Sequence, residues 1–275
     1  MIKKIATIIL NRNLPEPTNS LYEHIKLYDG KENDIYILEA GSDENLISKY
    51  ANWVADTPQI KKEGLRYGRG MNYALLKLWE ENIWSDYDAF FLLTNDTELS
   101  QEPTINKLKQ ILEKHKRIGI LSPCSSKWGE KYLLKKQKTK YFWFIHNHAL
   151  LLRRDFLEEI MEKDNPNYFN FIFDGNNFRG CFTNHELIAK AYANDWSAAI
   201  TSEVFAEHNE SYLLNKNDLI KTESYHLNMQ LYLEEGFKWL KQKYGFNSHW
   251  AMQQYVKSFY ENFFEFHPEL LNYKI

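Results

Sequence analysis

The chain has 275 residues, enough to bury one large hydrophobic core or one domain with an appendage. Charged residues make up 26% of the chain, the formal net charge is −3 and the lysines are dispersed, which argues against a nucleic-acid partner. No segment approaches the roughly 20 apolar residues of a transmembrane helix, and the two cysteines show neither zinc-site spacing nor a disulfide framework, so we expect a cytoplasmic protein.

The first half of the chain alternates strand-like and helix-like segments. Apolar, β-branched runs predict strands, and apolar residues at helical spacing predict helices. In chain order these are a strand at 5–10, a helix at 20–28, a strand at 34–39, a helix at 72–84, a strand at 89–94, a helix at 104–115 and a strand at 118–121. This alternation predicts an α/β fold with a largely parallel sheet covered by helices.

The second half of the chain is less regular and becomes helical and aromatic towards its end. Its predicted elements are a long strand at 141–152, a helix at 153–161, a structured loop at 164–181, a helix at 184–194, a strand at 198–205 and two helices at 223–244 and 250–264. We therefore divide the chain into a domain at 1–212 and a helical C-terminal extension at 213–275.

The apolar run at 89–94 ends abruptly in Asn95 and Asp96, and a helix-like segment follows. Open α/β sheets bind their ligands at the carboxyl ends of buried strands, and this is how such a sheet delivers a carboxylate there. That carboxylate can hold a divalent cation, and the cation can hold a diphosphate. Taken alone, an Asn-Asp pair is more typical of a surface turn.

Polar residues follow other predicted strands too. The clusters are Asn11-Arg12, Glu39-Ala-Gly-Ser-Asp43, Asn95-Asp96, His146-Asn147 and Glu207-His208. In a parallel sheet these ends meet at one edge, so together they predict a single site. The common phosphate motifs are absent, since Gly68-Arg-Gly70 lacks the third glycine and the preceding strand of a dinucleotide fingerprint, and no P-loop occurs.

The order of these motifs resembles family-2 glycosyltransferases with the GT-A fold. The resemblance covers about residues 5–212. It rests on the opening strand with its Asn11-Arg12 turn, the second-strand signature Leu38-Glu-Ala-Gly-Ser-Asp-Glu-Asn45, the turn Gly68-Arg-Gly-Met-Asn72, Leu93-Thr-Asn-Asp96 at the place of the DxD-type metal motif, the block from Phe173 to Leu187, and Asn194-Asp-Trp196 with Glu207-His208 after it. Any one of these motifs is weak, and their shared order makes the resemblance specific.

The resemblance implies an inverting transfer of a sugar from a nucleotide-diphosphate sugar to a hydroxyl of a glycan or glycoconjugate acceptor. The leaving diphosphate needs its charge neutralised, which Mn²⁺ or Mg²⁺ does without proton transfer. By resemblance Asp96 is the metal ligand, and His208 adds a ligand or a phosphate contact. Thr94 stands where the family has its first Asp, so the metal would have one protein carboxylate, phosphate oxygens and water.

The same resemblance places a set of residues around the nucleotide. Glu39 and Asp43 would hold the base and ribose, and Glu39 replaces the family's usual Asp, which weakens the assignment of a nucleobase. Arg69 and Asn72 would meet the diphosphate or the base. The full predicted set is Asn11, Arg12, Glu39, Asp43, Arg69, Asn72 and Asn95.

An inverting transfer also needs a base that takes the proton of the acceptor hydroxyl. Asn184 matches the position of the family's usual carboxylate, and an amide cannot do that work. We predict Glu186 as the base, with His185 as the alternative; a different role for Glu186 is to orient the donor sugar or to cap the helix that follows. The strand with Trp143, His146 and Asn147 usually faces the acceptor, although core packing and edge polarity also account for these side chains.

Two questions stay open from the sequence. The absence of Asp at 94 and 184 leaves room for a second interpretation, a catalytically weakened GT-A domain that binds a glycan or a partner. The helical extension can pack onto the domain, shape the acceptor groove or form a homodimer interface. Peripheral contact with a membrane surface is a further role, although the extension shows no clear basic face.

Overall fold

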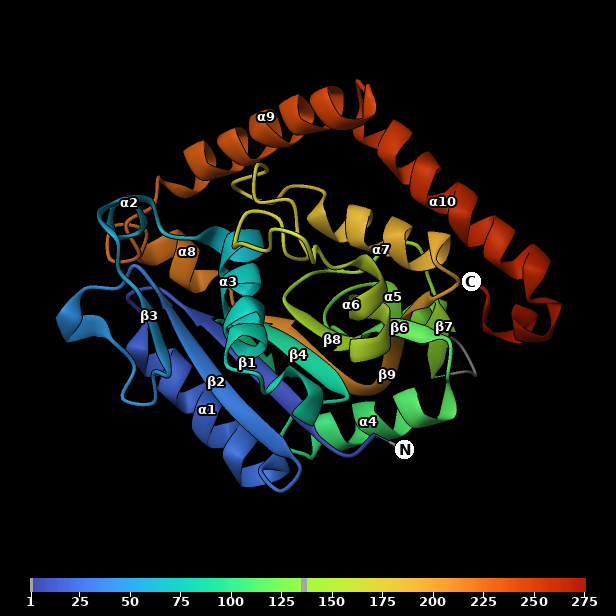
Figure 1. The fold of residues 1–275 in the computed structure, drawn as a ribbon, viewed down its shortest axis with the longest axis horizontal. Coiled ribbons are helices and arrows are strands. Elements are labelled where there is room, and N and C mark those ends of the chain that lie inside the picture. Colours follow the sequence, from blue (N-terminus) through green and yellow to red (C-terminus); the bar gives the residue numbers. More distant parts are fainter. Residues whose placement is uncertain (1, 135–137) are drawn as a thin grey trace.

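The structure, a computed structural model, describes residues 2–134 and 138–275, and Figure 1 shows a central sheet with helices packed around it. In the described part of the chain the sheet has nine strands. They are β1 (Ile5–Asn11), β2 (Asn33–Ala40), β3 (Trp53–Ala55), β4 (Ala89–Thr94), β5 (Thr97–Leu99), β6 (Ile118–Cys124), β7 (Thr139–Tyr141), β8 (Ala149–Arg153) and β9 (Ser197–His208).

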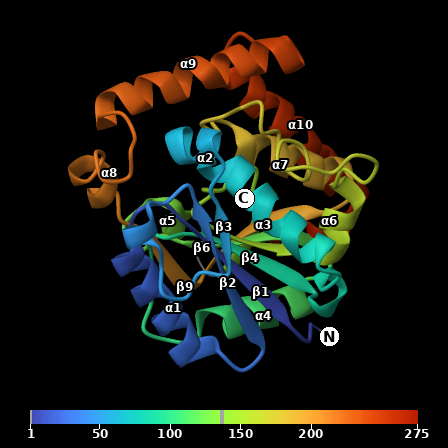
Figure 2. The same cartoon turned by 60° about the vertical axis from the view of Figure 1, so that its left-hand side comes forward.

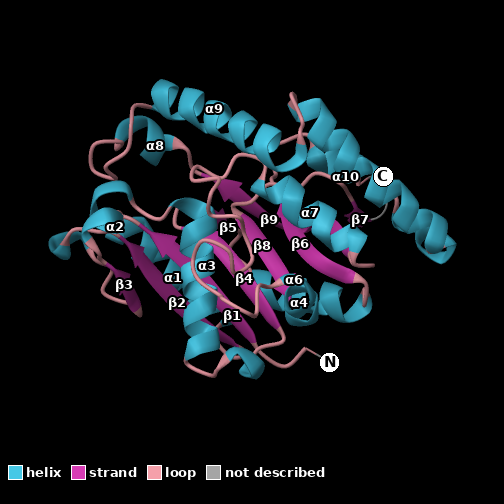
Figure 3. Cartoon of the chain, turned by 45° about the horizontal axis from the view of Figure 1, so that its top comes forward, coloured by secondary structure: helices cyan, strands magenta, loops and turns pink. Residues whose placement is uncertain are grey.

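The strands lie in the order β3-β2-β1-β4-β8-β6-β9-β5, and β7 also pairs with β9 (Figure 3). Strands β1, β2, β3, β4, β6 and β9 run in one direction, and β5, β7 and β8 run against them. The predicted α/β fold with a mostly parallel sheet is therefore confirmed. In this register Asn11 lies opposite Glu39, and Leu10 lies opposite Thr94, so the polar strand ends meet at one edge.

Helices cover both faces of the sheet. They are α1 (Pro15–Asp29), α2 (Pro58–Glu63), α3 (Arg66–Glu80), α4 (Thr104–Lys114), α5 (Glu130–Leu133), α6 (Arg154–Ile160), α7 (Thr183–Ala193), α8 (Ser211–Asn215), α9 (Tyr225–Tyr244) and α10 (His249–Phe266), with short 3₁₀ turns at Glu44–Leu46, Trp84–Asp86 and Pro268–Tyr273. Figure 2 shows α1 and α4 below the sheet and α3, α6 and α7 above it. Within the described residues, no helix is both long and apolar enough to span a membrane.

Two predicted elements differ from the structure. The stretch 141–152 is not one strand, because β7 ends at Tyr141 and β8 begins at Ala149. The segment between them, residues 142–148, buries Phe142 and Ile145. An apolar run alone does not distinguish a buried strand from a buried loop. After Asp96 the chain forms β5, which pairs antiparallel with β9, before the next helix begins.

The C-terminal extension packs onto the domain. Helix α10 lies against α7, and α9 extends across the top of the molecule in Figure 1. Its buried side chains belong to the same hydrophobic core as the sheet; they are Trp239, Leu240, Met252, Val256, Tyr260, Phe263 and Phe264. Beyond α10, Lys274 forms an isolated parallel bridge with Tyr141 of β7, so the end of the chain also lies against the sheet.

Candidate functional site

A cavity of about 220 Å³ lies at the carboxyl ends of β1, β2 and β4. Its walls come from these strand ends, the start of α3 and the segment between β9 and α9, which we call the α8 linker (residues 209–224). The lining residues are Leu10, Asn11, Arg12, Leu14, Ala40, Arg66, Tyr67, Thr94, Asn95, Asp96, Tyr212, Ile220 and Thr222. Of the predicted site residues, the structure thus brings Asn11, Arg12, Asn95 and Asp96 together around one cavity.

Four of these lining residues have a side-chain polar atom that is closed to solvent and has no hydrogen-bond partner among the described residues. The atoms are Arg12 Nε, Arg66 Nε, Tyr67 Oη and Asp96 Oδ1. Leaving such an atom unpaired costs about 1–3 kcal/mol, so folded proteins keep few of them without a reason. Three donors suit an anion, and one carboxylate oxygen suits a cation.

Asp96 and His208 form a pair at this edge. Asp96 Oδ2 lies 2.9 Å from His208 Nε2, and the pairing of Thr97 with His208 in the β5–β9 ladder brings them together. Burial raises the pKa of Asp96, but the hydrogen bond and charge of His208 outweigh it, and the net pKa is lowered. Burial lowers the pKa of His208, whereas Asp96 raises it by more. Both effects favour the charged pair.

The donor set at Asp96 bears on whether a metal fits. No group of three or more His, Cys, Asp or Glu side chains suited to a metal occurs in residues 2–134 and 138–275. Mg²⁺ in proteins is often held by one or two carboxylates together with substrate phosphates and water. The unpaired Asp96 Oδ1 fits a cation of that kind, one that the protein shares with a phosphate ligand, whereas His208 donates to Asp96 in its charged state and would have to lose its proton to become a ligand.

Glu39 is fully buried, and both of its carboxylate oxygens accept hydrogen bonds from the protein. The Asn11 amide donates to both of its oxygens, at 3.0 and 2.9 Å. The Ser42 hydroxyl and the Ser48 N–H donate to it as well, at 2.5 and 2.8 Å. Asn95 in turn donates to Asn11 Oδ1 at 2.8 Å. Glu39 thus orients Asn11 and the loop after β2, and its predicted contact with a base or ribose would require it to leave this network.

Arg12 lines the cavity, whereas Asp43 is not among its lining residues. Asp43 pairs with Lys221 of the α8 linker, and this ion pair lowers the pKa of the carboxyl group. Arg12 Nη2 donates to the carbonyl oxygens of Lys61 and Lys62, at 3.2 and 3.1 Å. Burial, with the nearby Arg66, lowers the pKa of Arg12 to about 10, so the guanidinium stays charged at neutral pH.

Two residues predicted to meet the nucleotide, Asn72 and Arg69, do not line the cavity. The buried Asn72 amide donates to the carbonyl oxygens of Tyr168 and Phe173, at 3.1 and 2.7 Å. Its oxygen accepts from the N–H groups of Ile172 and Phe173, both at 2.9 Å. Asn72 therefore holds the loop that precedes α7.

Arg69 is occupied by the same loop. Its Nε donates to the Gly175 carbonyl at 2.7 Å. Its guanidinium lies 4.5 Å from the ring centre of Phe169 and 4.6 Å from that of Phe178. Together with Asn72, it fastens the 164–181 loop to α3.

The first turn of α7 carries the residues predicted for proton transfer. The Asn184 amide donates to the Ile145 carbonyl at 2.6 Å, and its oxygen lies 2.9 Å from His185 Nδ1. His185 Nε2 is buried without a partner among the described residues, and burial lowers the pKa of this imidazole to about 4. Glu186 points towards α9 and is 3% exposed. Its Oε1 accepts from Tyr244 Oη and Lys243 Nζ, at 2.7 and 2.6 Å.

The site has members that we did not predict from the sequence. Arg66 and Tyr67 lie just before the Gly68-Arg-Gly70 turn that drew attention in the sequence, and their polarity was the only available signal. Tyr212, Ile220 and Thr222 come from the α8 linker, more than a hundred residues from the other walls. No local pattern marks such a contribution.

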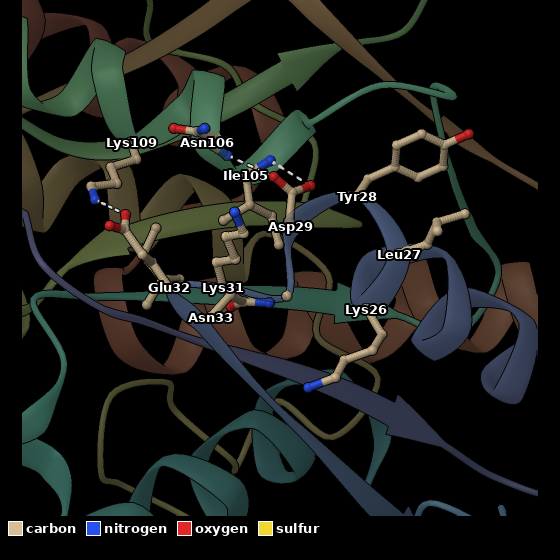
Figure 4. Close-up of a pocket in the computed structure, with 12 residues that line it drawn as sticks. Lys26, Leu27, Tyr28, Asp29, Lys31, Glu32, Asn33, Ile105, Asn106 and Lys109 are labelled. Carbon is tan, nitrogen blue, oxygen red and sulfur yellow. Dashed lines mark hydrogen bonds and ion pairs between the residues drawn. The ribbon is translucent and has the colours of Figure 1, made fainter.

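A larger cavity, of about 650 Å³, lies at the opposite edge of the sheet, near the amino ends of β1 and β2 (Figure 4). Asp29 accepts from the N–H groups of Ile105 and Asn106, at 3.1 and 2.9 Å. Lys109 pairs with Glu32. These charged groups are already satisfied by the protein, and open α/β sheets bind ligands at the other edge, so we place the candidate site at Asp96.

The comparisons with known proteins concern the fold. No protein-family model matches the sequence, and no curated protein matches it. Several solved structures do match. TarS 1–349 from S. aureus, in complex with UDP-GlcNAc, superimposes with a TM-score of 0.54 at 15% identity over 96% of this chain and 73% of that one. The chain has the GT-A fold.

Two further GT-A structures extend the comparison. GalNAc-T7 with UDP, GalNAc and Mn²⁺ matches with a TM-score of 0.56 at 9% identity, over 88% of this chain and 58% of that one. The mannosyltransferase PcManGT from Pyrobaculum calidifontis, with GDP-Man and Mn²⁺, matches with a TM-score of 0.52 at 10% identity, over 94% of this chain and 86% of that one. In a longer TarS structure the match covers 85% of this chain and 43% of the TarS chain. At these identities the likeness establishes the GT-A fold alone.

Proposed function

We propose that the chain is an inverting, metal-dependent glycosyltransferase, which moves a sugar from a nucleotide-diphosphate sugar to a hydroxyl of a glycan or glycoconjugate. The observation that carries this proposal is the set of four unpaired polar atoms around the cavity beside Asp96 and His208. The bound molecules of the structural neighbours agree with it, since TarS was solved with UDP-GlcNAc and PcManGT with GDP-Man and Mn²⁺.

The cavity offers separate contacts for the two parts of a nucleoside diphosphate. Arg12 and Arg66 bring guanidinium groups, which form strong, charge-assisted hydrogen bonds to phosphate oxygens. Arg66 Nη2 already pairs with Glu223 at 3.1 Å, so its Nε is the donor that a phosphate would meet. The apolar side chains of Leu10, Leu14 and Ile220 can cover the nucleoside. Asp96 would hold Mn²⁺ or Mg²⁺ together with the phosphates, with His208 as a further ligand only in its neutral form, and the ion would neutralise charge on the leaving diphosphate.

For the base we keep Glu186 as the prediction and His185 as the alternative. Since the Asn184 amide donates to Ile145, its oxygen accepts from His185 Nδ1, which leaves the Nε2 lone pair free. The lowered pKa keeps this imidazole neutral at physiological pH. In both cases a covered group must become accessible to the acceptor, and for Glu186 the contacts with Lys243 and Tyr244 must loosen.

The second candidate function is a GT-A domain that binds a glycan or partner without catalysis. The observation that favours it is the occupied carboxylate of Glu186 beside an amide at 184. Release of nucleoside diphosphate from a nucleotide sugar in the presence of Mn²⁺ would separate the two functions, because a binding module releases none.

The remaining expectations about partners and location are proposals as well. We infer a cytoplasmic location from Cys124 and Cys181, which are buried and not joined in a disulfide. A homodimer through the C-terminal helices would have to use surfaces other than the α10 face that packs on α7. Contact with a membrane surface stays a prediction.

The decisive experiment is an Asp96→Asn substitution. We expect UDP or GDP with Mn²⁺ to raise the melting temperature of the natural protein, and Asp96→Asn to lose the Mn²⁺-dependent part of this shift because the metal loses its carboxylate. Glu98→Gln is the matched control, since Glu98 is exposed two residues further along and contacts Asn209 instead of His208. A full Mn²⁺-dependent shift in Asp96→Asn would contradict the metal site, and no shift with any nucleotide would contradict the proposed enzyme.

A further inference from the structure

A row of aromatic rings leads away from Asp96 on the side opposite the cavity. His208, which bonds Asp96, stacks on His148 with ring centres 5.8 Å apart. The His148 and Trp128 rings are nearly perpendicular with centres 5.7 Å apart, and the His146 ring centre lies 3.9 Å from that of Trp128. The row therefore connects the end of β9, the segment 142–148 before β8 and the turn after β6. Trp128, at its far end, is partly exposed.

The turn that carries Trp128 is tied to the strand that carries His208. Glu207 accepts from the Ser125 hydroxyl at 2.5 Å, and from the N–H and hydroxyl of Ser126 at 2.6 and 2.5 Å. Ser125 Oγ in turn accepts from the N–H of Trp128 at 3.2 Å.

A second contact, between His146 and Glu130, holds the two polar groups beside the indole. His146 Nε2 lies 3.2 Å from Glu130 Oε1, just after the Trp128 turn. The indole is thus placed before any ligand arrives, and an imidazole and a carboxylate lie beside it. A prepositioned aromatic face flanked by a few polar groups is typical of small-molecule sites.

The position of this row relative to the cavity indicates where the acceptor binds. The cavity lies over β1, β2 and β4, whereas Trp128 and its neighbours come from the connections of β6, β8 and β9. The Asp96–His208 pair lies between the two. If a nucleotide sugar occupies the cavity, an acceptor has to approach the sugar from the other side.

We propose that Trp128 is a stacking platform for a sugar ring of the acceptor, an inference that rests on the proposed glycosyl transfer. One face of a pyranose consists largely of C–H groups and packs on an indole, while its hydroxyls extend sideways to polar groups such as His146 and Glu130. We expect loss of the indole face to weaken saccharide binding about tenfold, which corresponds to about 1.4 kcal/mol. The ligand class is therefore a neutral saccharide.

The experiment measures saccharide binding directly, without turnover. Methyl glycosides of glucose, galactose and N-acetylglucosamine are titrated in the presence of UDP and Mn²⁺, with saturation-transfer NMR as the readout. We expect ring C–H signals with the natural protein, and about tenfold weaker binding with Trp128→Ala. Trp128→Phe should restore part of the affinity because it keeps an aromatic face. Trp250→Ala is the matched control, since Trp250 is 63% exposed on α10 and contacts His249 instead of the rings beside Trp128.

Parallel readouts keep the outcomes distinct. The melting-temperature shift with UDP and Mn²⁺ reports the nucleotide site, so saccharide binding without that shift would support the platform and contradict the proposed function. If Trp128→Ala fails to fold, the indole N–H signal of Trp128 in the natural protein should shift on saccharide addition. Equal saccharide binding by Trp128→Ala and the natural protein, or none of the three glycosides binding the natural protein, would overturn the proposal.

Discussion

At the residue scale, hydrogen-bond satisfaction separates two groups of polar side chains. Glu39 and Asn72 are fully buried, and each makes four hydrogen bonds within the protein. Arg12, Tyr67 and Asp96 keep an atom without a partner in the described structure, and all three line the same cavity. Both groups look alike in the sequence. An unmet hydrogen bond is the stronger sign of a ligand, because a satisfied group has no free energy to gain by binding one.

The base assignment can be tested with two substitutions that break one ion pair. Glu186→Gln and Lys243→Met both break the Glu186–Lys243 ion pair, but only the first removes the carboxylate, and Lys243→Met also breaks the ion pair between Lys243 and Asp174. We expect Glu186→Gln to lower turnover about a hundredfold, the lower end of the usual contribution of a general base. Lys243→Met should keep most of the turnover, and both variants should keep nucleotide binding. The measurements are nucleoside-diphosphate release and the UDP-dependent melting shift.

The opposite result would reassign the base. If Glu186→Gln and Lys243→Met lose stability equally and turnover follows only the folded fraction, Glu186 serves to hold α9. His185 would then be the remaining candidate on the first turn of α7, and His185→Gln should abolish turnover.

At the scale of elements, the loop at 164–181 shows how an irregular segment is held in place. Its backbone forms turn hydrogen bonds of its own, such as that from the Gly175 N–H to the Phe169 carbonyl, and the Asn72 side chain of α3 adds four hydrogen bonds to its backbone groups. This loop leads into α7 and so determines where Asn184, His185 and Glu186 lie. Asn72 acts on the candidate site from a distance.

We expect Asn72→Ala to destabilise the protein by about 3 kcal/mol, because it leaves two N–H groups and two carbonyls of the loop unpaired. Urea denaturation measures this change. Asn106→Ala on the exposed surface of α4 is the control and should change stability little. Unchanged stability of Asn72→Ala together with lost UDP binding would instead place the amide in the nucleotide site, as the resemblance implied.

Elements were predicted correctly where their signal lies in neighbouring residues, and wrongly where it depends on distant ones. Helices α3 and α4 have apolar residues on one face, and both were predicted within a few residues except that α3 begins at Arg66 instead of 72. The stretch 141–152 was wrongly predicted as one strand, because its apolar residues are buried in the segment 142–148 as well as in the strands β7 and β8. The short β5 was missed because its partner, β9, lies about a hundred residues away.

At the scale of the whole molecule, the C-terminal extension and the domain share one core. Tyr260 and Phe263 of α10 pack against Tyr192 of α7, with ring centres 5.5 and 5.3 Å apart. The α8 linker adds Tyr212, Ile220 and Thr222 to the cavity. The predicted division at residue 212 therefore crosses packed structure.

We expect a fragment of residues 1–212 not to fold cooperatively, because it loses the side chains that cover α7; fully burying a large apolar side chain contributes about 1.5–3 kcal/mol. Circular dichroism with thermal melting tests this, with the full chain as the reference. A fragment that melts cooperatively near the temperature of the full chain would show that the domain at 1–212 is independent. A folded fragment that no longer binds UDP would assign the α8 linker to nucleotide binding.

The sequence by itself determined the alternation of strands and helices and the polar residues that end the strands. These depend on hydrophobic periodicity and on chain order, both of which are local properties. It also indicated the GT-A fold through the order of its motifs, and the structural likeness to TarS and PcManGT agrees with that fold.

Only the tertiary structure decided which polar side chains are free. The sheet order places Asp96 beside His208, and the buried networks around Glu39, Asn72 and Glu186 occupy groups that the sequence left available. The structure also closes the cavity with the α8 linker and places Trp128 on its far side. The physical reason is that hydrogen-bond partners and burial depend on contacts between distant segments, which no local pattern encodes.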